Sequence, residues 1–143
     1  MANKIKWDTP AAYDAALSTG LNSLASGSSA SSSAIANGTD LYPLMDVSIT
    51  LASLTPGTGG YVEVHVLPLL DNGTSYPDVF SGGPTMVGAF QLLSGASAKN
   101  GMLTGIQIPP GDFKLALLNV AGASLASSGN TVKSRRYDIN ANA

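Results

Sequence analysis

The sequence contains no cysteine, only one histidine and one tryptophan, and a single glutamate. Without cysteine, neither a disulfide framework nor a thiolate metal site is available. Charge is also scarce, because only 11% of the 143 residues are charged and the formal net charge is -2. Proteins that bind nucleic acid need a basic surface, so we expect no nucleic-acid partner.

Long apolar runs are missing as well. No stretch approaches the roughly 20 residues that cross a membrane, and the first residues lack the apolar core of a signal peptide. We therefore expect no membrane association, and a protein that stays in the cytoplasm or in a particle assembled there. A chain of this length forms one domain with its own core, here divided into an N-terminal arm with a short helix (1–28) and a β-domain (29–143).

The most regular stretch runs from Tyr61 to Leu70. Three valines at alternate positions interleave with Tyr61, Glu63 and His65. In an extended chain this period of two places all valines on one face and their partners on the other. The pattern predicts a half-buried β-strand with His65 and Glu63 on its outward face.

Similar stretches follow one another along the chain, separated by turns rich in glycine, proline and asparagine. We expect further strands over residues 29–37, 41–54, 86–93, 102–108, 113–118 and 131–139. This spacing predicts an all-β fold, an antiparallel β-sandwich of jelly-roll-like topology, although a barrel fits the same periodicity. The charged last strand reads as a sheet edge kept soluble by its basic residues.

One segment has helical periodicity instead. Thr9-Pro10 suits a helix start, and apolar residues recur at helical spacing from Tyr13 to Leu24. We therefore expect a short amphipathic helix over residues 10–24, preceded by an extended arm.

Catalytic chemistry has little support in the sequence. His65 is the only ordinary general base, and no nucleophile motif surrounds it, so we interpret it as a solvated or interface histidine. A single glutamate and turn-bound aspartates do not favour paired carboxylates. Asp71 and Asp78 lack calcium-loop spacing and fit a hairpin turn. We expect no enzyme activity, no catalytic residues, no metal and no cofactor.

Basic and aromatic side chains gather in particular parts of the chain, and these are the parts where we expect partner binding. The basic residues lie mainly near the two chain ends, and the long loop from Asp71 to Pro84 carries two aromatic side chains. If the ends lie together, they form a basic patch on an otherwise acidic body. The predicted partner-binding residues are Lys4, Lys6, Trp7, Tyr76, Phe80, Lys133, Arg135 and Arg136.

Several short motifs are spread over nearly the whole chain. They are Ile5-Lys6-Trp7-Asp8, the segment around Tyr13 and Leu17, Asn22-Ser23-Leu24-Ala25, Leu51-Ala52-Ser53-Leu54-Thr55-Pro56, Leu67-Pro68, Tyr76-Pro77, Ile108-Pro109-Pro110-Gly111, Phe113-Lys114 and Ser128-Gly129-Asn130-Thr131. Together they resemble a family of small virion structural proteins of tailed bacteriophages. The resemblance implies a capsid decoration or cement protein that sits on the outside of the head, bridges subunits of the major capsid protein and is often a homotrimer.

Other functions stay open at this point. Within the virion, the protein would alternatively be associated with the tail or a fibre. The aromatic loop also fits a lectin-like carbohydrate-binding module. A hydrolase would require two carboxylates, or His65 and a hydroxyl, to meet in a concave pocket.

Overall fold

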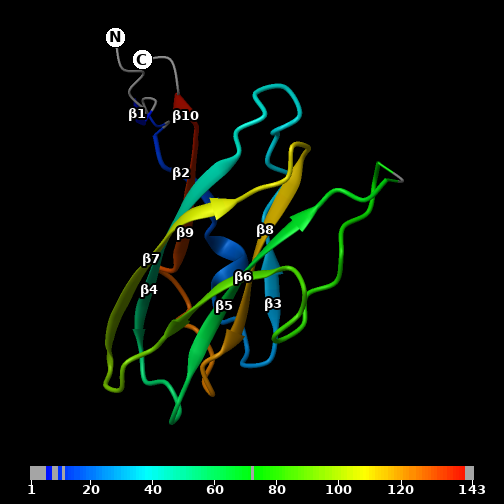
Figure 1. Cartoon of the computed structure of the whole chain (residues 1–143). Helices are drawn as coiled ribbons and strands as arrows, with labels where there is room; N and C mark the ends of the chain where they lie inside the picture. Colours follow the sequence, from blue (N-terminus) through cyan, green and yellow to red (C-terminus); the bar gives the residue numbers. More distant parts are fainter. Residues whose placement is uncertain (1–5, 8–9, 11, 72, 141–143) are drawn as a thin grey trace.

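The structure of the protein is a computed structural model that describes residues 6–7, 10, 12–71 and 73–140 (Figure 1). Over these residues the fold is all-β, with one short 3₁₀ helix, η1, at Thr19–Leu21. The described part contains no helix long and apolar enough to cross a membrane. In chain order, the strands are β1 (Lys6–Trp7), β2 (Asp14–Leu17), β3 (Ser29–Ser31), β4 (Leu44–Leu54), β5 (Tyr61–Pro68), β6 (Met86–Gln91), β7 (Ser97–Gln107), β8 (Phe113–Val120), β9 (Thr131–Tyr137) and β10 (Ile139–Asn140).

Eight of these strands form two four-stranded antiparallel sheets. The first sheet has the order β2-β9-β4-β7, and the second has the order β3-β8-β5-β6. Ile49 of β4 lies opposite Val132 of β9, and Val64 of β5 lies opposite Leu117 of β8. Because all four belong to one buried cluster, the two sheets enclose a common core in a β-sandwich-like arrangement.

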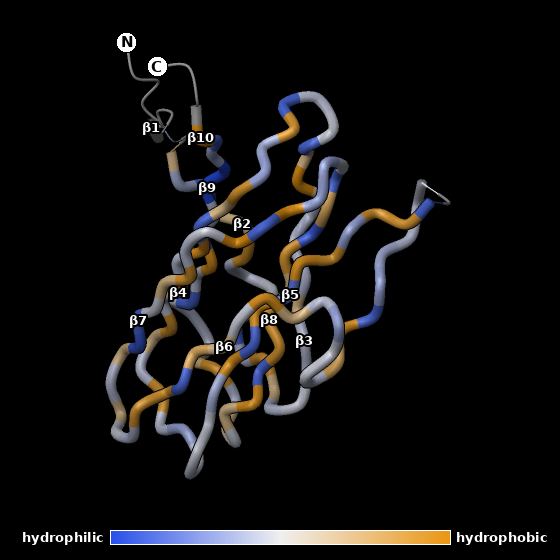
Figure 2. Tube along the Cα trace, viewed as in Figure 1, coloured by the Kyte–Doolittle hydropathy of each residue, from blue (hydrophilic) through white to orange (hydrophobic). Residues whose placement is uncertain are grey.

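The alternation of apolar and polar residues explains this core. Figure 2 shows hydrophobic positions recurring along β4, β5 and β8 between more polar ones. Phe113, Leu115 and Leu117, at every second position of β8, have no exposed surface. Burying one such side chain contributes about 1.5–3 kcal/mol to the stability of the fold. Because the alternation repeats on both sheets, burial of these side chains is the main force that holds the sheets together.

The predicted strands are confirmed with changed ends. The largest change is in β7, which begins at Ser97, well before the expected residue 102. The serine-rich stretch expected to be a strand over 29–37 pairs with β8 only at Ser29–Ser31, and again through a single bridge between Ile35 and Phe113.

The predicted helix over residues 10–24 is wrong. Asp14–Leu17 forms β2, which pairs with β9 with a register shift between Ala15 and Leu17, and the short helix η1 follows it. Leu17 and Leu21 are buried as expected, but from a strand and a 3₁₀ turn. Ser18, Thr19 and Gly20 disfavour a continuous helix, and pairing with β9 satisfies the backbone groups that a helix would have bonded internally. Residues 14–21 therefore belong to the same sheet and core as the later strands.

The last long strand is not a sheet edge, so that prediction is also wrong. β9 lies between β2 and β4, with Ala15 opposite Lys133 and Asp46 opposite Arg135. One of the basic residues that suggested an edge, Arg135, forms an ion pair with Asp46 of the neighbouring strand β4. The two ends of the described chain do meet, because Lys6 and Trp7 of β1 pair with Asn140 and Ile139 of β10 (Figure 1).

Candidate functional site

The densest group of reactive side chains lies on the outer face of the second sheet. Glu63 and His65, the only glutamate and the only histidine, occupy alternate positions of β5 on the face opposite the core valines. Their outward register agrees with the sequence pattern, but their exposure does not. Glu63 is 2% exposed and His65 is 0% exposed.

The loop between β5 and β6 (residues 69–85, called the β5–β6 loop) covers these side chains. Figure 1 shows the described parts of this loop extending outward from the end of β5 and returning to the sheet at β6. The amide of Val66 donates to the carbonyl of Thr85 at 3.0 Å, which fixes the returning end beside β5. The interpretation of His65 as solvated or at an interface is therefore wrong, because the loop that follows its own strand folds back and buries it.

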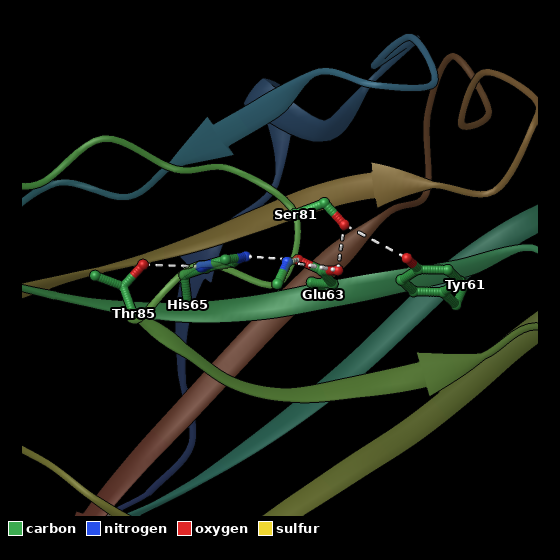
Figure 3. A network of polar contacts seen from close by, with 6 residues as sticks. Tyr61, Glu63, His65, Ser81 and Thr85 are labelled. Atoms are coloured by element: carbon green, nitrogen blue, oxygen red, sulfur yellow. Dashed lines mark hydrogen bonds and ion pairs between the residues drawn. The ribbon is translucent and has the colours of Figure 1, made fainter.

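A continuous hydrogen-bond network joins loop and strand (Figure 3). The Glu63 carboxylate accepts hydrogen bonds from Ser81 Oγ at 2.7 Å and from the Gly82 amide at 3.1 Å to Oε2 and 3.3 Å to Oε1. His65 Nε2 lies 3.1 Å from Glu63 Oε2, and His65 Nδ1 lies 2.9 Å from Thr85 Oγ1. Both ring nitrogens and both carboxylate oxygens are thus engaged.

The carboxylate is held in its charged form. Burial raises the pKa of Glu63, but the hydrogen bonds from Ser81, Gly82 and His65, together with the charge of His65, lower the pKa more. The net pKa lies below the ordinary value of 4.5. A buried carboxylate with this many donors is a strong anchor for the loop that supplies them.

The same atoms form a hydroxyl, imidazole and carboxylate in sequence, from Thr85 through His65 to Glu63. This is the arrangement in which a base activates a nucleophile and a carboxylate orients the base. The hydrolase hypothesis required His65 and a hydroxyl to meet in a concave pocket, and only the meeting itself is observed, between His65 and Thr85. However, His65 has no exposed surface and the loop carrying Thr85 covers it, so a substrate would have to displace the loop. The arrangement as it stands fastens the loop.

A second polar cluster lies on the outer face of the first sheet. Arg135 donates from Nε and Nη2 to Asp46 Oδ2 at 3.0 and 2.9 Å, and the Gly105 amide donates to Asp46 Oδ1 at 3.1 Å. The Arg135 guanidinium also lies over the Tyr13 ring, with Cζ 4.7 Å from its centroid. The side chain predicted to bind a partner is therefore already bound within the sheet.

The other predicted basic residues are placed differently. Arg136 lies 5.4 Å from the centroid of the Tyr42 ring and donates to the Ala36 carbonyl, whereas Lys133 is exposed on β9. Arg135 and Arg136 both line a hollow of about 260 Å³ between β2, β9 and the segment after β3. The backbones of Lys6 and Trp7 form β1, which pairs with the C-terminal strand β10. Lys4 lies outside the described residues.

The two aromatic residues of the loop do not act together. Tyr76 is half-buried, with the Lys114 ammonium 4.4 Å from its ring centroid, so it ties the loop to β8. Phe80 is 57% exposed. In the described part of the chain, no three histidine or acidic side chains come together as metal ligands.

The sequence pattern did not reveal Ser81, Thr85 or Asp46 as site residues. Ser81 and Thr85 matter only because the loop returns to β5, and no local pattern reports that return. Asp46 interrupts an apolar strand, which is the one available signal that a polar partner would be needed there.

No family model matches the chain, and no curated protein matches its sequence.

Proposed function

We propose that the protein is a structural protein of the virion of a tailed bacteriophage, a decoration or cement protein that binds the outside of the head and bridges major capsid protein subunits. In this role it is a homo-oligomer, with a trimer favoured. The proposal rests on the resemblance of its motifs and on one structural observation, the order of its strands.

That order supports a jelly-roll interpretation. When a long antiparallel hairpin of eight strands is rolled up, the first strand pairs with the last, the second with the seventh, and so on inward. With β2 as the first strand, the pairs β2·β9, β3·β8, β4·β7 and β5·β6 follow this rule, and all are antiparallel. Jelly rolls are common in viral capsid proteins, and also in lectins and cupins, so the argument from fold is one of analogy.

The use of the reactive side chains is consistent with this role. His65 and Glu63 fasten a loop, and Asp46 and Arg135 fasten the outer face of the first sheet. Among the exposed positions of that face, Thr50 and Met102 are uncharged and Lys133 carries a single charge. A neutral surface of this kind suits close packing repeated by symmetry.

Reconstitution tests the proposal. Purified protein is added to phage heads that lack it, and binding and the temperature of head disassembly are measured. We expect saturable binding and a higher disassembly temperature. Heads that bind none of the protein would contradict the proposal.

Two single charge removals provide a matched pair for this assay. Lys133→Gln removes an exposed charge from β9 and is expected to weaken binding. Lys99→Gln removes a charge from β7 whose ammonium already donates to the Gly95 carbonyl and Ser97 Oγ, and it is expected to leave binding unchanged.

Carbohydrate binding is the second candidate, favoured by the exposed ring of Phe80 on a projecting loop. Aromatic faces of this kind offer apolar contact area to a ligand. A glycan array that shows binding by the protein and none by Phe80→Ala would favour this function over the first, and an array without binding would remove it.

A further inference from the structure

Beside Glu63 and His65, the outer face of the second sheet carries a strip of buried apolar side chains, whose burial we attribute to the β5–β6 loop. On this face, Leu67, Ala116 and Leu118 are 3%, 1% and 5% exposed, and none of them belongs to the core between the sheets. In the register of β5 and β8, Ala116 lies opposite His65 and Leu118 lies opposite Glu63. The strip is therefore continuous with the polar network, and opening the loop would expose apolar surface together with His65.

The side-chain network that holds residues 81–85 of the loop centres on one charged group, in addition to the Val66–Thr85 backbone bond and the Lys114–Tyr76 contact. Ser81 and Gly82 both donate to the Glu63 carboxylate, and Thr85 reaches the same carboxylate through His65 (Figure 3). An ionised carboxylate only accepts hydrogen bonds, whereas a protonated one carries a donor. A proton on Glu63 would therefore oppose one of the existing donors and would remove the charge that strengthens the others.

Among the residues that the structure describes, the strand neighbours of Glu63 include no second anion. From β8 it faces Leu118, from β6 it faces Ala89, and from its own strand it is flanked by Tyr61 and His65. The nearest cation on β8 is Lys114, which lies over Tyr76. The aspartates of the loop, Asp71 and Asp78, are exposed.

His65 lies between the two groups that it joins, Glu63 and Thr85. A proton on His65 leaves donors on both ring nitrogens, and these still suit Glu63 and Thr85 as acceptors. A further proton on Glu63 would leave a buried imidazolium without its counter-charge, which strongly disfavours the closed loop. Ser81 is exposed, so solvent reaches the network at that point.

From this geometry we propose that the β5–β6 loop is an acid-released strap: it stays closed while Glu63 is ionised, and it opens when Glu63 is protonated, before the sandwich unfolds. Opening uncovers the strip formed by Leu67, Ala116 and Leu118. The inference does not depend on the proposed function.

The direction of the pH effect follows from the low pKa of Glu63 in the folded protein. A group with a depressed pKa stabilises the closed form above its ordinary pKa, and this stabilisation is lost as the pH falls through the lower, folded value. Below that value Glu63 is protonated in both the closed and the open form, so a further fall in pH no longer changes the free energy of opening through this group. Between the ordinary and the folded pKa, protection falls about tenfold per pH unit.

Hydrogen exchange of the whole chain tests the strap. The reporter amides are Gly82, which donates to Glu63, and Val66, which donates to Thr85, and the reference amides are those of β4 and β9. After correction for intrinsic rates, we expect the reporters to lose protection by at least about tenfold relative to the references as the pH falls from about 7 to about 3. Simultaneous loss in reporters and references would overturn the proposal.

Two variants identify the group responsible. Glu63→Gln should make reporter protection independent of pH over this range, whereas Asp46→Asn, at the buried carboxylate of the first sheet, should keep the wild-type response. Wild-type pH dependence in Glu63→Gln would overturn the proposal. Should Glu63→Gln fail to fold, Ser81→Ala removes one donor to Glu63, together with the contact to the Tyr61 hydroxyl, and should move the opening midpoint upward by about half to one pH unit. An unmoved midpoint would also overturn the proposal.

Discussion

Arg135 and Asp46 bind each other across β9 and β4 through two guanidinium nitrogens and one carboxylate oxygen, at 3.0 and 2.9 Å. Asp46 is 4% exposed, and the Gly105 amide occupies its other oxygen. The pair therefore joins three strands of the first sheet, since Gly105 belongs to β7.

Asp46→Ala removes the acceptor for all three of these hydrogen bonds. It leaves the Gly105 amide and the guanidinium without this partner, and we expect the free energy of unfolding to fall by about 2–4 kcal/mol. Urea denaturation measures the change. Asp40→Ala, at an exposed turn position, serves as the control and should change stability by no more than about 0.5 kcal/mol. Equal effects of the two variants would contradict the assigned role of Asp46.

Tyr137 gives the first sheet an alkaline limit. Burial raises the pKa of its phenol, and the charge and hydrogen bond of Asp46 raise the pKa further, whereas the Gly105 amide and the charge of Arg135 lower it in part. A raised folded pKa means that this contribution to stability is complete below the unfolded value of about 10 and is lost as the pH rises through the folded value.

We therefore expect stability to decline above about pH 10, and Tyr137→Phe to reduce that decline. Denaturation curves at a series of alkaline pH values provide the measurement, and the absorbance of tyrosinate reports the titration. A decline of the same size in Tyr137→Phe would show that another group is responsible.

Gly101 allows an aromatic ring to close one side of the sandwich. A Cβ at this position would lie 2.2 Å from a ring carbon of Phe90, which comes from β6 of the other sheet. Gly101→Ala should therefore destabilise the protein by about 1–3 kcal/mol. Gly111→Ala is the matched control because a Cβ there meets nothing within 4 Å, and it should be neutral or slightly stabilising. Thermal unfolding of both variants distinguishes the two effects.

Asn119 connects three segments at one end of the sandwich. Its side-chain amide donates to the carbonyls of Leu24 and Ala123, both at 2.9 Å, and its oxygen accepts from the Ala121 amide at 2.9 Å. Because Asn119 is fully buried, Asn119→Ala should cost about 2–4 kcal/mol. Asn100→Ala, at an exposed position of β7, should have little effect in the same denaturation experiment.

Much of the sheet structure could be predicted, because a period of two is a local property. The valines of β5 face the core, as their alternation with Tyr61, Glu63 and His65 required. The errors occur where distant segments decide the outcome. β2 has helical spacing but pairs with β9, and β9 carries edge-type charges but has β2 beside it.

The candidate site shows the same division. The sequence placed Glu63 and His65 on the outward face, and this was correct, but local periodicity contains no information about a loop that folds back over that face. Asn119 and Asp46 illustrate the related problem that a polar residue within an apolar strand indicates a buried hydrogen-bond network without naming its partners.

The proposed function requires a phage whose genome encodes this chain, and its most direct test is a cryo-electron microscopy reconstruction of that particle. The account predicts repeated density on the outer surface of the head that accommodates the two four-stranded sheets and contacts more than one major capsid protein subunit. A head reconstruction in which every outer density is explained by other chains would contradict it.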